Sequence, residues 1–182
     1  MNMELLKCQF IRNLNDLCGR ELELLNVLPQ MVDLAQSPDL KSAFHDHFEK
    51  TQDHIRRLTQ VLAELGERPA IFKWQDKREA IRKNKHRFQQ AGGRSKAIDT
   101  VLIEAVQNME HYEISSYLLA LNCAQILGYH TAFDLLAPAL NDEYEASRIL
   151  AEIAQVMKST EAAADQSAEK SGDAVFTALL AH

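Results

Sequence analysis

The sequence has few of the residues that break helices or cross-link small domains. Six glycines and four prolines occur among 182 residues, while Ala, Leu, Glu and Gln are abundant. This balance favours helix over strand. The three cysteines, Cys8, Cys18 and Cys123, are scattered and form no CxxC pair. We therefore interpret them as reduced core residues of a cytosolic protein rather than as disulfide or redox groups.

Long apolar runs and an excess of positive charge are also missing. No apolar run reaches the length that a bilayer span needs, and residues 1–8 lack the pattern of a signal peptide. The net charge is -6, and no basic stripe suggests nucleic-acid binding. Gly-rich phosphate loops and the GxSxG and HExxH motifs are absent as well. We expect a soluble, cytoplasmic protein that binds neither membranes nor nucleic acid.

What the sequence does contain is helical periodicity over most of its length. Apolar residues recur at steps of three and four, which is typical of helices with one buried face. Ser37 is placed to cap a helix, while Gly66 and Gly128 are placed to end two others. Pro29 is expected to bend or end the first helix, and Pro138 to kink or delay the last. The predicted long helices cover residues 4–35, 38–65, 95–127 and 131–157.

The connection between the second and third helices is long. Residues 67–94 include an amphipathic basic stretch, for which we predict a short helix over 74–89. A long crossover at this point is what an up-down-down-up, ferritin-like bundle requires. The fold class is therefore all-α: a ferritin-like four-helix bundle over residues 1–157, with a C-terminal tail over 158–182. The tail combines a polar linker or frayed helix with a short apolar segment, which either folds back or holds a protein partner.

Carboxylates interrupt the apolar faces of three predicted helices. Glu21 lies on the first helix, Glu110 and Glu113 on the third, and Glu143 on the fourth, each near mid-helix. Antiparallel packing brings helix midpoints together, so these groups could converge at one level of the core. A buried, unpaired carboxylate is costly and must be protonated, paired or bound to metal. Divalent cations remove the mutual repulsion in di-iron and di-manganese bundles.

The second helix adds His47 on its apolar face and His54 at the edge of that face. Each polar residue also has a structural interpretation: Glu21 with its carboxylate in water, Glu110 and Glu113 sharing a proton, and the histidines as boundary residues. Tyr117 either donates a hydrogen bond to this layer or packs against it. A polar, hydrogen-bonded layer without metal therefore stays open as an alternative.

Several stretches resemble a known family. Residues 109–117, MEHYEISSY, are similar to the EHYEIA-Y signature of the YciE/YciF family of ferritin-like stress proteins. Residues 43–51, AFHDHFEKT, resemble its second-helix AFHxHxEET run, and residues 127–129 its LGY turn. Asn15, Asp16 and Glu21 match its first-helix pattern. The resemblance covers residues 3–157.

This resemblance implies a closed bundle, commonly a homodimer, with a ferritin-like di-metal site and induction under osmotic, bile or oxidative stress. Six residues carry over by position: Glu21, His47, Glu49, Glu110, Glu113 and Glu143. Lys50, Gln52 and Ser147 depart from the family pattern, and an inward-pointing Lys50 ammonium could replace a cation.

Two hypotheses about function follow. In the first, the protein is a stress-response protein with an iron or manganese centre that could react with peroxide or dioxygen. In the second, it is a non-catalytic dimer that acts through protein contacts and has a degenerate site. Whether it is an enzyme stays open. The candidate metal ligands are Glu21, His47, Glu49, His54, Glu110, Glu113 and Glu143.

Overall fold

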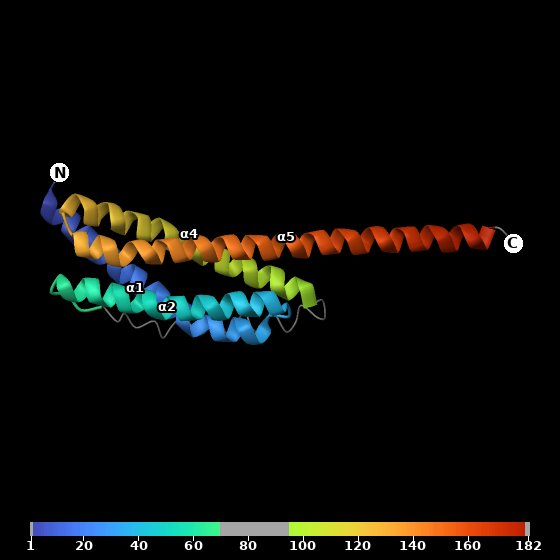
Figure 1. Cartoon of the computed structure of the whole chain (residues 1–182), viewed down its shortest axis with the longest axis horizontal. Coiled ribbons are helices and arrows are strands. Elements are labelled where there is room, and N and C mark those ends of the chain that lie inside the picture. Colours follow the sequence, from blue (N-terminus) through green and yellow to red (C-terminus); the bar gives the residue numbers. More distant parts are fainter. Residues whose placement is uncertain (1, 70–94, 181–182) are drawn as a thin grey trace.

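The computed structural model describes residues 2–69 and 95–180, with side chains described over 2–69 and 98–160. Its helices are α1 (Met3–Leu34), α2 (Pro38–Glu64), α4 (Ser95–Leu127) and α5 (His130–Leu180). α1 packs on α2 and α4, and α5 packs on the same two helices (Figure 1). The described part of the chain is therefore a four-helix bundle, as predicted.

The contacts between α1 and α4 fix the topology. The Asn13 side chain donates a hydrogen bond to the carbonyl of Ser116 at 2.8 Å, and Asp99 accepts one from the amide of Gln36 at 2.7 Å. α4 is thus antiparallel to α1, and short connections make α2 antiparallel to α1 and α5 antiparallel to α4. This is the predicted up-down-down-up order, in which α2 ends and α4 begins at opposite ends of the bundle. The predicted short helix at 74–89 lies outside the described residues.

The helix boundaries follow the local signals at most positions. Ser37 caps α2 with its side chain, and Gly66 and Gly128 follow α2 and α4 with φ angles of 77° and 74°. Pro29 does not end α1, which continues to Leu34. Pro138 lies inside α5 and does not delay the start of that helix. α5 continues past residue 157 to Leu180, so the predicted end at 157 was too early, whereas the helix considered as one alternative for the polar stretch is present (Figure 1). Ala, Glu and Lys favour helix where little can be buried.

Two apolar clusters fill the bundle. One contains Leu17 of α1, and the other contains Leu24 of the same helix; Glu21 lies between them along α1. On α2, Leu58 belongs to the first cluster and Phe44 to the second. The residues between them lie at the same level of the bundle as Glu21. The core is therefore apolar toward each end and polar in the middle.

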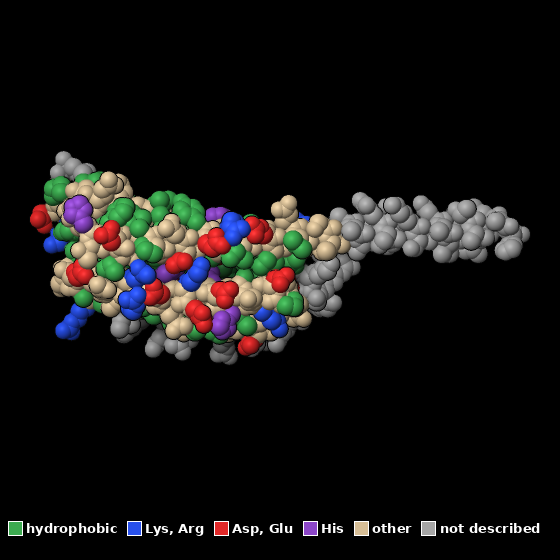
Figure 2. Space-filling model, in the orientation of Figure 1, with side chains coloured by type: hydrophobic (Ala, Val, Ile, Leu, Met, Phe, Trp, Pro, Cys, Tyr) green, Lys and Arg blue, Asp and Glu red, His purple; other side chains and the backbone are tan. Residues whose placement is uncertain are grey.

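The described surface differs from helix to helix, and the three cysteines differ in burial. Charged side chains are spread over α2 and α5 in Figure 2, and hydrophobic side chains gather along α4 at its upper edge. Cys18 and Cys123 are buried, as predicted, whereas Cys8 is exposed, so its assignment to the core was wrong. None of the described helices is both long and apolar enough to cross a lipid bilayer.

Candidate metal centre

Six of the seven predicted ligands meet in the middle of the bundle. Five are 0% exposed and the sixth, His47, is 4% exposed. They come from all four described helices, because each interrupts the apolar face of its own helix at a similar depth. We call these residues the core layer: Glu21, His47, His54, Glu110, Glu113 and Glu143.

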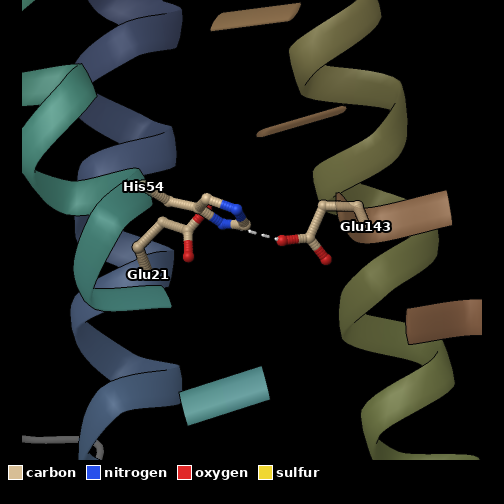
Figure 3. Close-up of side chains that lie close together, drawn as sticks. All are labelled: Glu21, His54 and Glu143. Atoms are coloured by element: carbon tan, nitrogen blue, oxygen red, sulfur yellow. Dashed lines mark ion pairs between the residues drawn. The ribbon is translucent and has the colours of Figure 1, made fainter. Parts of the chain in front are cut away.

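Three members of the core layer approach each other most closely. The Nδ1 atom of His54 lies 3.2 Å from Oε1 of Glu21 and 3.1 Å from Oε1 of Glu143. One ligand atom from each residue lies within 4.8 Å of the other two. Figure 3 shows the three side chains pointing toward one another from α1, α2 and α5. We call them the inner trio.

Neighbouring groups orient the inner trio. The Nε2 atom of His54 lies 3.3 Å from Oδ2 of Asp142, whose other oxygen lies 3.3 Å from Nζ of Lys50. The Tyr117 hydroxyl donates a hydrogen bond to Oε1 of Glu21 at 2.6 Å, one of the two roles considered for it from the sequence. A carboxylate on one ring nitrogen directs the other nitrogen of a metal-binding histidine toward the ion. Asp142 therefore turns Nδ1 of His54 toward the two glutamates.

A second group of contacts joins the inner trio to the rest of the layer. The Nδ1 atom of His47 lies 3.5 Å from Oε1 of Glu110, and its Nε2 atom lies 3.6 Å from Oε2 of Glu143. Glu143 therefore faces one histidine with each of its oxygens. Glu113 lies in the same field, since Glu21, Glu143 and Glu110 all raise its pKa in addition to burial.

Burial and charge pull the pKa values of this layer apart. Burial raises the pKa of Glu110 to about 7 and also raises the pKa values of Glu21 and Glu113. Burial acts in the same direction on Glu143, but the two imidazoles beside it outweigh burial and hold its pKa at about 2.

The histidines show the complementary shift. Burial acts to lower the pKa of His54, yet the carboxylates of Glu143 and Glu21 raise it to about 10. The pKa of His47 is raised by Glu143 and Glu110 against the same effect of burial. The shifts are reciprocal: the two imidazoles favour the ionised form of Glu143, and Glu143 favours their protonated forms. A metal cation would neutralise the same carboxylates.

The polar atoms of the layer are poorly satisfied by one another. Within the described residues, the buried side-chain oxygens and nitrogens without a hydrogen-bond partner belong to the core layer and to Thr51. Such atoms are rare in folded proteins and call for a missing partner. Carboxylate oxygens and imidazole nitrogens are ligands that first-row divalent metals accept. The donor set therefore fits a divalent first-row metal ion.

The remaining predicted ligand, Glu49, lies elsewhere. Its side chain is 67% exposed, with Oε1 4.0 Å from Nδ1 of His45. Residues two positions apart point to opposite sides of a helix, so Glu49 cannot share the buried face of His47. The structure therefore does not bring Glu49 to the core layer.

Three departures from the family pattern can also be placed. Lys50 is 35% exposed and pairs with Asp142, so it lies at the edge of the layer. Gln52 is exposed, and Ser147 lies close enough to Glu110 to act on its pKa. The sequence reasoning missed Asp142, because an acidic residue beside a buried glutamate resembles any solvated surface residue.

Comparison with known proteins shows that the chain matches a described family. Residues 6–164 match the family described as "Domain of unknown function (DUF892)". Protein YciF of Escherichia coli strain K12 is 30% identical over 143 residues, which span 79% of this chain and 86% of YciF.

Solved structures agree with the fold. The crystal structure of the Escherichia coli stress protein YciF superposes with a TM-score of 0.75 at 28% identity, covering 85% of this chain and 97% of that one. A Rhodopseudomonas palustris protein titled "YcfI, a putative structural protein" gives 0.70 at 27% identity, covering 80% and 92% of the two chains. A Xanthomonas campestris protein at 18% identity gives 0.70 over 89% and 99%, which shows the fold alone.

Proposed function

The chain belongs to the YciE/YciF family, described as DUF892, and from this premise we propose that its core layer binds divalent iron or manganese. The observation that supports the proposal is the inner trio. Ligand atoms from three helices lie within 4.8 Å of one another, buried from solvent and poorly paired. A role in the response to stress is part of the same proposal, because the relative in Escherichia coli is titled a stress protein.

Different residues of the core layer would hold each of two metal ions. Glu21, His54 and Glu143 would hold one ion, and His47 and Glu110 would hold a second one. Four glutamate carboxylates balance the charge of two divalent cations. Glu113, which lies in the field of the other three carboxylates, would complete the shell.

Other side chains position these ligands. Tyr117 holds Glu21 by its hydrogen bond, and Asp142 holds the ring of His54. Iron or manganese in such a site would supply electron transfer to peroxide or dioxygen. Thr51 stands three residues before His54, where ferritin-like bundles carry a glutamate. Glu143, which lies 3.1 Å from His54 and 3.6 Å from His47, would supply a carboxylate to both histidine ligands.

Metal loading tests the proposal. After anaerobic incubation with micromolar Fe(II) or Mn(II) and desalting, we expect about one or two ions per chain by elemental analysis. The Glu49→Gln variant serves as a control and should bind the same amount, because Glu49 points away from the core. Protein that stays metal-free under these conditions would contradict the proposal.

A second candidate function acts through protein contacts. Tyr112, Leu118, Leu119 and Ile126 of α4 are each more than 40% exposed. Residues 112, 119 and 126 are seven apart and so lie in a line along the helix. Figure 2 shows hydrophobic side chains gathered along α4. We propose that this stripe joins two copies of the chain. The cytoplasmic location and a partner for the C-terminal tail stay predictions.

Leu119→Glu is expected to convert the dimer into a monomer, because it places a charge at the centre of the stripe. Val156→Glu on α5 is a matched control, since Val156 is 60% exposed and lies on another helix. Sedimentation analysis distinguishes the two states. If the chain is monomeric without substitution, or if Leu119→Glu stays dimeric, the stripe is not the interface.

A further inference from the structure

A groove between the first half of α2 and the middle of α5 leads toward the core layer. Its cavity measures about 380 Å³ and is lined by residues between Ser37 and Lys50 of α2 and between Ala146 and Met157 of α5, together with Glu110 of α4. Phe44, Leu150 and Ile153 make its walls mainly apolar. In Figure 2 hydrophobic side chains lie between α5 and α2 in the right-hand half of the described surface, with acidic side chains around them. At about 30 Å³ each, several water molecules fit in this volume.

The inner end of the groove is polar and unsatisfied. His47 and Glu110 line it, although they are only 4% and 0% exposed. Both oxygens of Glu110 and the Nε2 atom of His47 lack a hydrogen-bond partner. These are the atoms that a ligand arriving through the groove would meet first.

From that point, short steps reach the inner trio. His47 lies 3.5 Å from Glu110 and 3.6 Å from Glu143. Glu143 in turn lies 3.1 Å from Nδ1 of His54. Because these separations are all short, an ion could change ligands without ever losing a carboxylate or imidazole neighbour.

The charges at the mouth favour a cation. Asp39, Asp46 and Glu152 are exposed residues that line the groove, although Glu152 also pairs with Arg148. Lys50 is the one lysine or arginine among the described lining residues, and its ammonium lies 3.3 Å from Asp142. A cleft with charges of one sign and low-dielectric walls concentrates ions of the opposite charge. An anion, by contrast, would meet the acidic rim and then Glu110.

We propose that this groove is the route by which divalent cations reach the inner trio, with Asp39 and Asp46 attracting the ion and Glu110 and His47 binding it first. This proposal rests on the proposed metal-binding function. It concerns the rates of uptake and release rather than the final affinity, which separates the two claims experimentally.

Blocking the mouth is the first test. Ser42 is exposed and lines the groove, so Ser42→Trp narrows it without touching the core. Co(II) uptake is followed by visible absorption in a stopped-flow instrument, and release by competition with a chelator. A barrier on the route should slow both rates by the same factor, on the order of tenfold, and leave the equilibrium affinity unchanged. Gln52→Trp places the same side chain on α2 at an exposed position outside the groove, and should have no effect.

Removing the rim charge is the second test. Asp39→Asn/Asp46→Asn should slow Co(II) association at low ionic strength by about tenfold, and the difference should shrink as salt is added. Asp16→Asn/Asp33→Asn removes the same charge from exposed positions of α1 and is the control.

The outcomes are distinguishable. Unchanged rates in either Ser42→Trp or Asp39→Asn/Asp46→Asn would overturn the proposed route while leaving metal binding intact. Failure of the unsubstituted protein to bind Co(II) at equilibrium would instead contradict the proposed function, and the route with it.

Discussion

Glu143→Gln is expected to weaken metal binding by at least about 100-fold, because metal ligands contribute more than the surrounding groups whose loss costs 10–100-fold. Glu143 is the carboxylate that faces both His54 and His47, at 3.1 and 3.6 Å. Gln has the same shape but no charge, and its amide nitrogen cannot bind a cation. The substitution therefore affects both halves of the layer at once.

The expected effect can be read from thermal or chemical denaturation. At a metal concentration of about 100 times Kd, binding stabilises the native state by about 2.7 kcal/mol. A 100-fold weaker site at the same concentration would retain about 0.4 kcal/mol. Comparing Glu143→Gln with and without Mn(II) separates this loss from any change in the stability of the metal-free protein.

The matched control is Glu145→Gln, two residues further along α5. The side chain of Glu145 is 45% exposed and pairs with Arg148 rather than with the core layer. It should keep the full metal-dependent stabilisation. If Glu143→Gln also kept it, Glu143 would not be a ligand.

The stabilisation by metal is expected to grow steeply between about pH 6 and 8. The pKa of His54 is raised to about 10, so its contribution to metal-free stability is fully present below about pH 6.5 and is lost as pH rises toward 10. The pKa of Glu110 is raised to about 7, so its neutral form is favoured in the folded protein and its burial costs stability as pH rises from about 4.5 to 7. Both shifts make the metal-free protein less stable as pH rises.

The pKa shift of Glu143 changes the stability of the metal-free protein in the opposite direction. Its lowered pKa contributes stability above about pH 4.5 that is lost as pH falls toward 2. The metal-free protein should thus be most stable in weakly acidic solution. A cation must displace the protons that the raised pKa values of His54 and Glu110 retain, so each displaced proton changes its affinity about tenfold per pH unit.

Mn(II) titrations at several pH values measure this linkage. The rise in melting temperature on adding Mn(II) should increase from pH 6 to pH 8, and calorimetry in buffers of different ionisation enthalpy should report released protons. A rise in melting temperature that is independent of pH would show that the ion binds at surface carboxylates, which are already ionised in this range.

Local signals explain how much of the fold was predictable. Ser37, Gly66 and Gly128 mark helix ends through their own backbone chemistry, which needs no knowledge of neighbours. The core carboxylates were visible for a similar reason, because each interrupts an apolar face on its own helix. The end of α5 at Leu180 was not predictable, because the helix passes through Gly172, where a local stop signal would place its end.

The details of the site depend on the packing of side chains from different helices. His54 was expected at the edge of the apolar face but is fully buried, because α5 covers that side of α2. Asp142 becomes part of the site only through its approach to His54. Glu49 matched a family motif, yet its spacing of two residues from His47 places it on the opposite side of α2. Helix geometry alone is therefore enough to predict that Glu49 does not share the buried face of His47.

Anomalous diffraction from crystals of the Mn(II)-loaded protein is the most direct test of whether the core layer binds metal. We predict a manganese peak inside the bundle, within bonding distance of Nδ1 of His54 and of carboxylate oxygens of Glu21 and Glu143. Manganese found only at surface carboxylates, with His54 still paired to both glutamates, would contradict the account.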